Sequence, residues 1–241
     1  MTVLEEGLSQ LGLGGDDRIF SLLINYIEEI ELFNTAYGLV KVRDRQEFIV
    51  KHILDSLAPI KILEKLLKQS QQGPRTGMEQ PNSRWQAGRL VADVGSGAGL
   101  PGIPLAICME AEFTLIERMG RRTGFLRDVL AMLALPNAKV EEADMEELAL
   151  KLKWAGRFNL IVFRAFRPLE ADILKSLLRL LAPGGFIAAY KGRRESIEEE
   201  MDQVKTSQEI LPWEALPLEV PFLEEERHLL VIGLLSQGKV E

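Results

Sequence analysis

Three alternating glycines form the most distinctive stretch of the sequence. Gly95, Gly97 and Gly99 follow an apolar run that ends near Asp93, and they precede a predicted helix start. Glycine adopts positive φ without strain and lets a ligand approach the backbone closely, and the free amides of a helix start favour polar ligands. Glu117 ends the next apolar run, where its carboxylate can accept hydrogen bonds from both hydroxyls of a ribose. We therefore expect a nucleoside site built from this loop and Glu117.

The glycine spacing narrows the choice of ligand. The dinucleotide fingerprint GxGxxG requires glycine at position 100, where this chain has Leu100. A phosphate-binding P-loop would end in Gly-Lys-Ser/Thr, and this loop does not. A pyrophosphate is therefore disfavoured, and a nucleoside without one, such as S-adenosylmethionine, is favoured. The alternative is a glycine loop that serves only packing.

The residues available for methyl transfer point to an acceptor that needs no base. Cys108 lies in the predicted helix after the loop, beside Ile107 and Met109, so we interpret it as an apolar residue and not as a thiolate nucleophile. Residues 163–169 read "FRAFRPL", without the Asn/Asp-Pro-Pro-aromatic loop associated with adenine amine methylation. We expect no catalytic side chain and no metal site. A target that already presents a lone pair, such as guanine N7, fits, because proximity and orientation then suffice.

The remainder of the chain after position 88 alternates predicted strands with helices. Helical patterns cover "GRRTGFLRDVLAML" and "LEADILKSLLRLLAPGG". The predicted strands are "RLVADV", "FTLIE", "AKVEEA", "FNLIVF", "GGFIAAY" and "HLLVIGLL". This alternation predicts an α/β fold with a mostly parallel, doubly wound, Rossmann-like sheet, which binds its ligand at the carboxyl ends of the strands.

The first part of the chain is predicted to be helical. Residues 16–36 have apolar positions at a helical period behind Asp16 and Asp17, which are candidates to cap this helix. Asp44 and Glu47 resemble a capping box that opens "QEFIVKHILDSL", and Pro59 fits the first turn of "PIKILEKLLKQ". We divide the chain into an N-terminal helical subdomain (1–69), a flexible linker rich in Gly, Pro and Gln (70–88), and a cofactor-binding domain (89–241).

Charge is unevenly distributed along the chain. The formal net charge is −7, but residues 195–241 carry −9 and residues 1–194 carry +2, so RNA is not excluded as a partner. We expect Arg121, Arg122, Lys191 and Arg193 to contact RNA, with a solvated helix face as the alternative. The single cysteine fits a reducing, cytoplasmic compartment. The acidic start is unlike a secretory signal, and the longest late apolar run is too short to span a membrane.

Six stretches together form a specific ensemble: "VKHILDSLAP", "DVGSGAGLPGIPLA", "FTLIERMGRR", "RAF", "YKG" and "ERHLLVI". With them, the chain apart from the linker resembles the small-subunit ribosomal RNA methyltransferase G family, also called glucose-inhibited division protein B. The resemblance implies a bacterial cytosolic enzyme that methylates guanine N7 in 16S ribosomal RNA or the small subunit. It implies cofactor contacts from Gly95, Leu100, Met145, Glu146 and Arg164, to which we add Gly97, Gly99 and Glu117. For Arg164 we favour a clamp on the methionine carboxylate of the cofactor; the alternatives are a contact with guanine O6 and a surface arginine that only packs over Phe163 or Phe166. We expect a monomer.

Some features depart from the family or leave alternatives open. The family commonly has Asn-Leu-Thr where this chain has Gly38, Leu39 and Val40, and Asn34 is a candidate to replace part of that polarity. His52 and Asp55 lie three apart on one predicted helix, and we favour a structural pair over a catalytic one. Two other functions stay open: methylation of a small metabolite, and a non-catalytic assembly factor that binds S-adenosylmethionine and the small subunit.

Overall fold

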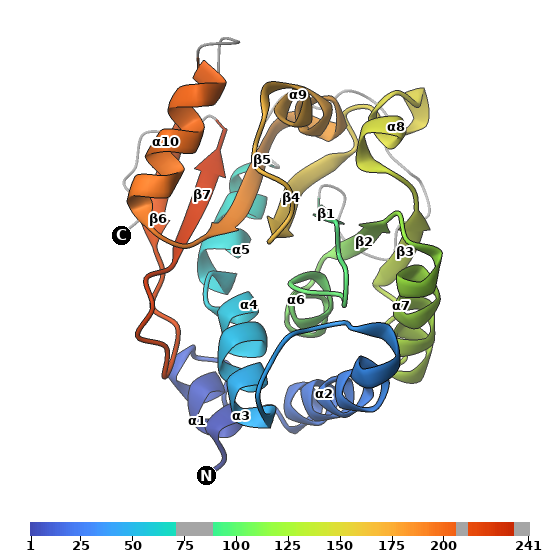
Figure 1. Cartoon of the computed structure of the whole chain (residues 1–241), viewed down its shortest axis with the longest axis vertical. Coiled ribbons are helices and arrows are strands. Elements are labelled where there is room, and N and C mark those ends of the chain that lie inside the picture. Colours follow the sequence, from blue (N-terminus) through green and yellow to red (C-terminus); the bar gives the residue numbers. More distant parts are fainter. Residues whose placement is uncertain (71–88, 206–211, 234–241) are drawn as a thin grey trace.

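A seven-stranded sheet forms the centre of the molecule. The computed structural model describes residues 1–70, 89–205 and 212–233. The sheet has the strand order β3-β2-β1-β4-β5-β7-β6, in which β1 to β5 run parallel and β7 runs antiparallel to both of its neighbours. The strands are β1 (Leu90–Val94), β2 (Glu112–Glu117), β3 (Ala138–Glu142), β4 (Phe158–Arg164), β5 (Leu181–Lys191), β6 (Trp213–Pro217) and β7 (His228–Ile232). The predicted doubly wound fold is confirmed (Figure 1).

The six predicted strands are present, and β6 is an addition. β1, β2 and β4 are almost wholly buried, because helices cover both faces of a parallel sheet. The strand order reverses between β1 and β4, where β1 pairs with β2 on one side and with β4 on the other. A crevice at the carboxyl ends of the strands is expected at this point.

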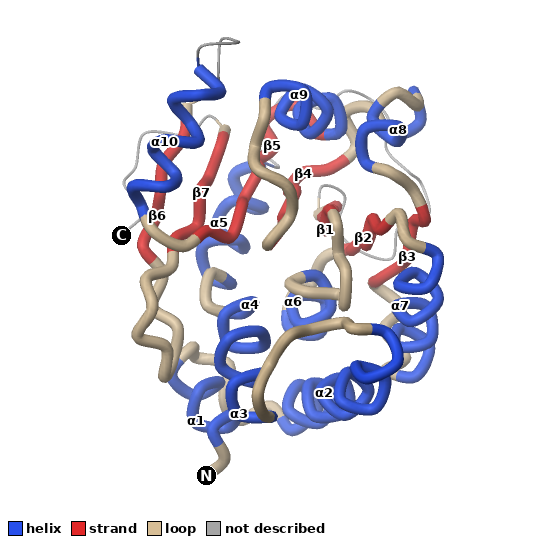
Figure 2. The backbone as a smooth tube through the Cα atoms, viewed as in Figure 1, coloured by secondary structure: helices blue, strands red, loops and turns tan. Residues whose placement is uncertain are grey.

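Two helical layers enclose the sheet (Figures 1 and 2). One layer contains α6 (Gly102–Cys108) and α7 (Gly120–Met132), and the other contains α8 (Met145–Ala149), α9 (Ala171–Leu180) and α10 (Arg194–Lys205). A short 3₁₀ turn, η2, covers Leu152–Trp154. Each layer shares a separate apolar core with its own face of the sheet.

The N-terminal helices pack on the same face as α6 and α7. They are α1 (Val3–Gln10), α2 (Asp17–Tyr37), α3 (Arg45–Phe48), the π-helix η1 (Ile49–Leu54), α4 (Asp55–Leu57) and α5 (Ile60–Ser70). Their buried side chains belong to the same core as those of the sheet, so the two regions are packed together. The predicted domain boundary at position 69 stays a prediction, and it does not separate two hydrophobic cores.

Local sequence explains how these helices begin and end. Asp16 caps α2 as predicted, and Gly38 ends it with φ +59, a left-handed conformation that glycine adopts without strain. The Asn34 side chain holds the following turn by bonding both the N–H and the C=O of Val40, at 2.9 and 3.0 Å. Gly38 thus serves as a helix terminator, which accounts for one departure from the family pattern.

The predicted helix over 46–57 differs from a regular α-helix. Asp44 caps it by accepting from the Glu47 N–H, but the Glu47 carboxylate accepts from the Arg43 N–H at 2.7 Å, so the capping box is only half formed. The middle of the segment is the π-helix η1, and such single π-turns occur often at functional sites. Residues 71–88 of the predicted linker lie outside the described residues. In the described part of the chain, no helix is both long and apolar enough to cross a membrane.

Candidate functional site

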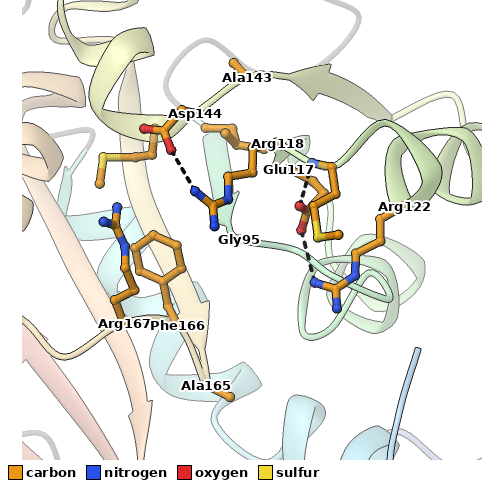
Figure 3. A pocket seen from close by; sticks show the side chains of 12 residues that line it. Gly95, Glu117, Arg118, Arg122, Ala143, Asp144, Ala165, Phe166 and Arg167 are labelled. Atoms are coloured by element: carbon orange, nitrogen blue, oxygen red, sulfur yellow. Dashed lines mark hydrogen bonds and ion pairs between the residues drawn. The ribbon is translucent and has the colours of Figure 1, made fainter. Parts of the chain in front are cut away.

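A pocket of about 290 Å³ opens at the carboxyl ends of the parallel strands, where the strand order reverses (Figure 3). Its walls come from the loops after β1, β2, β3 and β4. Twelve residues line it: Gly95, Ile116, Glu117, Arg118, Met119, Arg122, Ala143, Asp144, Met145, Ala165, Phe166 and Arg167.

The three glycines of the loop have different roles. Gly95 lines the pocket with φ +68, and a Cβ at this position would overlap the Phe166 ring. Gly97 has φ +57, and its N–H donates to Glu117 at 3.0 Å. A Cβ at Gly99 would instead overlap Ile103, so this glycine permits the loop to pack against the core. The loop is therefore shaped by both the pocket and the packing beneath it.

Glu117 connects the two loops at the floor of the pocket. Its side chain is only 5% exposed. One carboxylate oxygen accepts from the Gly97 N–H at 3.0 Å and the other accepts from the Met119 N–H at 2.9 Å. Each oxygen has two lone pairs, so each retains the capacity to accept a further hydrogen bond from a ligand hydroxyl. The guanidinium of Arg122 approaches the same carboxylate at 4.0 Å.

Two ion pairs flank the upper wall of the pocket. Arg118 extends from the end of β2 toward Asp144, with 3.9 Å between Nη1 and Oδ2 (Figure 3). Arg167 pairs with Glu146 at 2.5 Å and lies over the Phe166 ring, 5.2 Å from its centroid. Asp144 also caps α8 by accepting from the Glu146 N–H. Of the two predicted residues here, Met145 lines the pocket and Glu146 stands beside it.

Asp93 is a buried carboxyl group directly behind the glycine loop. One of its oxygens accepts from the Gly102 N–H at 3.0 Å, and the other has no hydrogen-bond partner among the described residues. Burial raises the pKa of Asp93 to about 7, because the low-dielectric interior disfavours the charged form. A cationic ligand group near this carboxyl would oppose that shift.

Leu100 and Arg164 were predicted to contact the cofactor, but neither residue lines the pocket. Leu100 is 6% exposed and packs in the core. Arg164 ends β4 next to pocket-lining Ala165, but its guanidinium turns to the N-terminal helices. It donates to the Lys51 C=O at 3.1 Å and to the Asp55 carboxylate at 2.8 Å, and it contacts His52 Nδ1 at 2.8 Å. The predicted carboxylate clamp would require the guanidinium to leave these partners.

The His52–Asp55 pair is bridged and not direct. Arg164 lies between the two side chains, and Arg227 donates from Nε to the other Asp55 oxygen at 3.2 Å. Asp55 is 3% exposed, so two guanidinium groups compensate a buried carboxylate. The pair joins the N-terminal helices to the ends of β4 and β7, which agrees with the structural role favoured from the sequence.

The four basic residues predicted to contact RNA are in unequal environments. Arg121 donates to the Ala36 C=O at 2.8 Å and lies over the Tyr37 ring at 5.1 Å. Lys191 is bound to Glu200 at 2.6 Å. Arg122 lines the pocket, and Arg193 is exposed. The last two are therefore better placed for a phosphate, and Arg118, with a side chain 72% exposed, joins them.

Several pocket residues were missed by the sequence reasoning. They follow the ends of predicted strands: Arg118 and Met119 after β2, Ala143 and Asp144 after β3, and Ala165, Phe166 and Arg167 after β4. The rule that ligands bind beyond the carboxyl ends of parallel strands was a sufficient signal for these positions. Cys108 stands on α6 outside the pocket lining, and burial raises the pKa of its thiol to about 12, which opposes a nucleophilic role.

Solved structures support the fold. A putative S-adenosyl-L-methionine-dependent methyltransferase from Methanococcus maripaludis is similar with a TM-score of 0.54 and 15% identity, covering 84% of this chain and 100% of that one. A SAM-dependent methyltransferase from Aquifex aeolicus is similar with a TM-score of 0.50 and 13% identity, covering 78% of this chain and 93% of that one. At these identities the likeness concerns the fold alone.

Sequence relatives identify the family. The family model for rRNA small subunit methyltransferase G matches residues 19–71 and 79–230. A protein named Ribosomal RNA small subunit methyltransferase G from Treponema denticola is 35% identical over 245 residues, covering 95% of this chain and 93% of its own length. A protein of the same name from Treponema pallidum (strain Nichols) is 40% identical over 222 residues, covering 88% of this chain and 84% of its own length. The chain therefore belongs to the rRNA small subunit methyltransferase G family.

Proposed function

We propose that this protein transfers a methyl group from S-adenosylmethionine to N7 of a guanine in the 16S ribosomal RNA of the small subunit. The observation that carries the proposal is the family match along nearly the whole chain, together with a nucleoside-type pocket at the switch point of the sheet. The cofactor, when bound, supplies the methyl group and a neutral thioether leaving group.

The residues of the pocket fit that cofactor. Glu117 offers nearly buried carboxylate oxygens for the ribose hydroxyls. Four apolar side chains that suit a purine line the pocket: Ile116, Met119, Met145 and Phe166. Asp93 lies behind the glycine loop and outside the pocket lining, where it is fully buried and accepts from the Gly102 N–H. A carboxylate for the ribose hydroxyls and apolar walls for the purine are the groups that a nucleoside requires, and Arg118, Arg122 and Arg167 add positive charge to the same lining.

The pocket residues orient and do not remove protons. Both Glu117 oxygens already hold loop amides, and Asp93 is fully buried, so neither is placed as a general base. Guanine N7 has a lone pair in the plane of the ring and loses no proton on methylation, so it matches such a site. Alignment of the cofactor with this lone pair then provides the rate enhancement.

The rim of the pocket suits a polyanion. Arg118 and Arg122 line the pocket, and Arg193 is exposed in the segment after β5. In the described part of the chain, close carboxylates do not fully compensate these three charges. Lys and Arg side chains that neutralise phosphates release counterions, which makes RNA binding salt-dependent. One chain supplies the complete pocket, so we propose that the protein acts as a monomer, in the cytoplasm where its proposed substrate resides.

The test is methyl transfer to small ribosomal subunits that lack the modification. Purified protein, labelled S-adenosylmethionine and these subunits should give one labelled guanine, methylated at N7 on mapping. Parallel reactions with free nucleosides and small acids test the metabolite alternative. Cofactor binding by calorimetry without any transfer would favour the assembly-factor alternative and refute the proposal.

A further inference from the structure

His52 occupies a constrained position beside Arg164, the last residue of β4, and outside the pocket lining itself. It lies in the π-helix η1, and its ring packs against Phe48 with 5.4 Å between centroids. Its Nδ1 faces the Arg164 guanidinium at 2.8 Å. Arg164 is the last residue of β4, and the next residue, Ala165, lines the pocket. His52 as a whole is half-buried.

The Arg164 contact fixes the tautomer of His52. A guanidinium has only N–H donors and never accepts, so Nδ1 must be the unprotonated acceptor nitrogen. A neutral ring that accepts at Nδ1 carries its hydrogen on Nε2. Independently, burial and then the Arg164 charge lower the pKa of His52 to about 4, so the ring is neutral at physiological pH. His52 is therefore a neutral Nε2–H donor, and the described residues provide no partner for that donor.

The strand order places this donor on the side of the pocket away from Glu117. Glu117 stands on β2, with β1 between it and β4. β3 and α8 close the pocket beyond β2, through Ala143 and Met145. The opposite side is formed by the end of β4, with His52 next to it. We therefore expect the target base to approach the reactive end of the cofactor from this side.

We propose that His52 is a specificity-determining residue that donates its Nε2–H to the 6-carbonyl oxygen of the target purine. The inference rests on the proposed function and deepens it. Guanine presents an acceptor at this position, whereas adenine presents an amino group whose hydrogens would face the His52 hydrogen. A neutral donor is suited to N7 methylation, because the purine becomes cationic and a charged donor would oppose that change.

Two substitutions separate this role from a structural one. In His52→Gln the side-chain amide can place an N–H near the former Nε2, whereas in His52→Asn the shorter side chain can replace only the Nδ1 acceptor that Arg164 uses. We expect His52→Asn to lower the single-turnover methylation rate of unmodified small subunits at least tenfold, and His52→Gln to stay within about threefold of wild type. Cofactor affinity by calorimetry should stay within threefold for both variants, and thermal melting verifies their folding. The reverse pattern, or equal rates for all three proteins, overturns the proposal.

The tautomer can be read without any activity. The chain has two histidines, and His228 provides an internal contrast because its Nδ1 faces the Gly192 C=O at 2.8 Å and must carry a hydrogen. Nitrogen-15 NMR of the histidine rings at pH 7 should show His52 protonated only on Nε2 and His228 protonated on Nδ1. Protonation of His52 at Nδ1, or a charged ring, overturns the inference.

A substrate analogue completes the test. Subunits reconstituted with 2-aminopurine at the target position keep N7 but lack the 6-carbonyl oxygen. We expect this replacement to slow the wild type at least tenfold and to slow His52→Asn by less than threefold further, since both remove the same hydrogen bond. If 2-aminopurine slows His52→Asn by the same factor as it slows the wild type, the two changes act independently and the proposal is overturned. If the wild type methylates no guanine at all, the proposed function has failed, and the NMR result still reports on the tautomer.

Discussion

Replacing Glu117 with glutamine should weaken cofactor binding while the protein stays folded. Glutamine retains one oxygen and presents an NH₂ group where the second oxygen accepted a backbone N–H. Either the Gly97 or the Met119 amide then faces a donor instead of an acceptor. Hydrogen bonds to charged groups contribute about 1.5–3 kcal/mol, so we expect an affinity loss of about 10- to 150-fold.

Calorimetric titration with S-adenosylmethionine measures the effect of Glu117→Gln directly. Glu142→Gln is the matched control, because Glu142 ends the neighbouring strand β3, undergoes the same chemical change and contacts Thr123 and Arg127 outside the pocket lining. Hydrogen exchange of the Gly97 and Met119 amides should accelerate only in Glu117→Gln. A Kd within threefold of wild type, with normal exchange, would refute the assignment of Glu117.

Three further predictions concern the loop, the basic rim and the buried carboxyl group. Gly97→Val should weaken cofactor binding at least tenfold, and Gly97→Asn should weaken it much less. The φ of Gly97 is +57 and a Cβ there would meet nothing closer than 3.8 Å, so the effect comes from backbone strain and not from steric overlap. Equal calorimetric affinities of the two variants would contradict this. Arg121→Ala should lower the free energy of unfolding by about 1 kcal/mol and leave the salt dependence of RNA binding unchanged. Arg122→Ala should instead make RNA binding less dependent on salt. Denaturant titration and RNA binding at several salt concentrations distinguish the two variants. The Asp93 pKa is raised from 3.8 to about 7 on folding, so its stabilising contribution is complete below pH 4 and is lost as pH rises to 7. Asp93→Asn should therefore gain stability relative to wild type by up to about 1.4 kcal/mol per pH unit over that window. A constant difference between urea titrations at pH 5 and 7 would exclude this effect.

The sheet was predictable because its signal is local. Each strand between two helical layers must be apolar on both faces, and β1, β2 and β4 are such runs in the sequence. β6 was missed because it is a short edge strand with mixed burial, "WEALP". α1 was missed although Thr2 and Glu5 form a complete capping box, a pattern that the sequence displays.

The partners of the charged residues were not predictable, because they come from remote parts of the chain. The end of β4 could be located from "FNLIVF", but the Arg164 guanidinium contacts residues more than a hundred positions earlier. Arg121 meets α2 across a comparable separation, and no local pattern distinguishes it from Arg122. The direction of a side chain depends on tertiary packing. The sequence therefore predicts that the segment is basic, but it does not predict which of its arginines is available to bind RNA.

The N-terminal helices complete both ends of the site. At one end, the buried Tyr26 hydroxyl of α2 donates to the Ala98 C=O at 2.9 Å and holds the glycine loop. At the other end, Asp55 binds Arg164 and Arg227 and fixes η1, with His52, beside β4. Removing one partner from a buried ion pair leaves an uncompensated charge, which costs about 3–5 kcal/mol. A change at Asp55 therefore acts on the acceptor side of the pocket and on the packing of the sheet at once. Because the same helices hold the loop that shapes the cofactor pocket, the two halves of the proposed reaction are aligned by one shared layer.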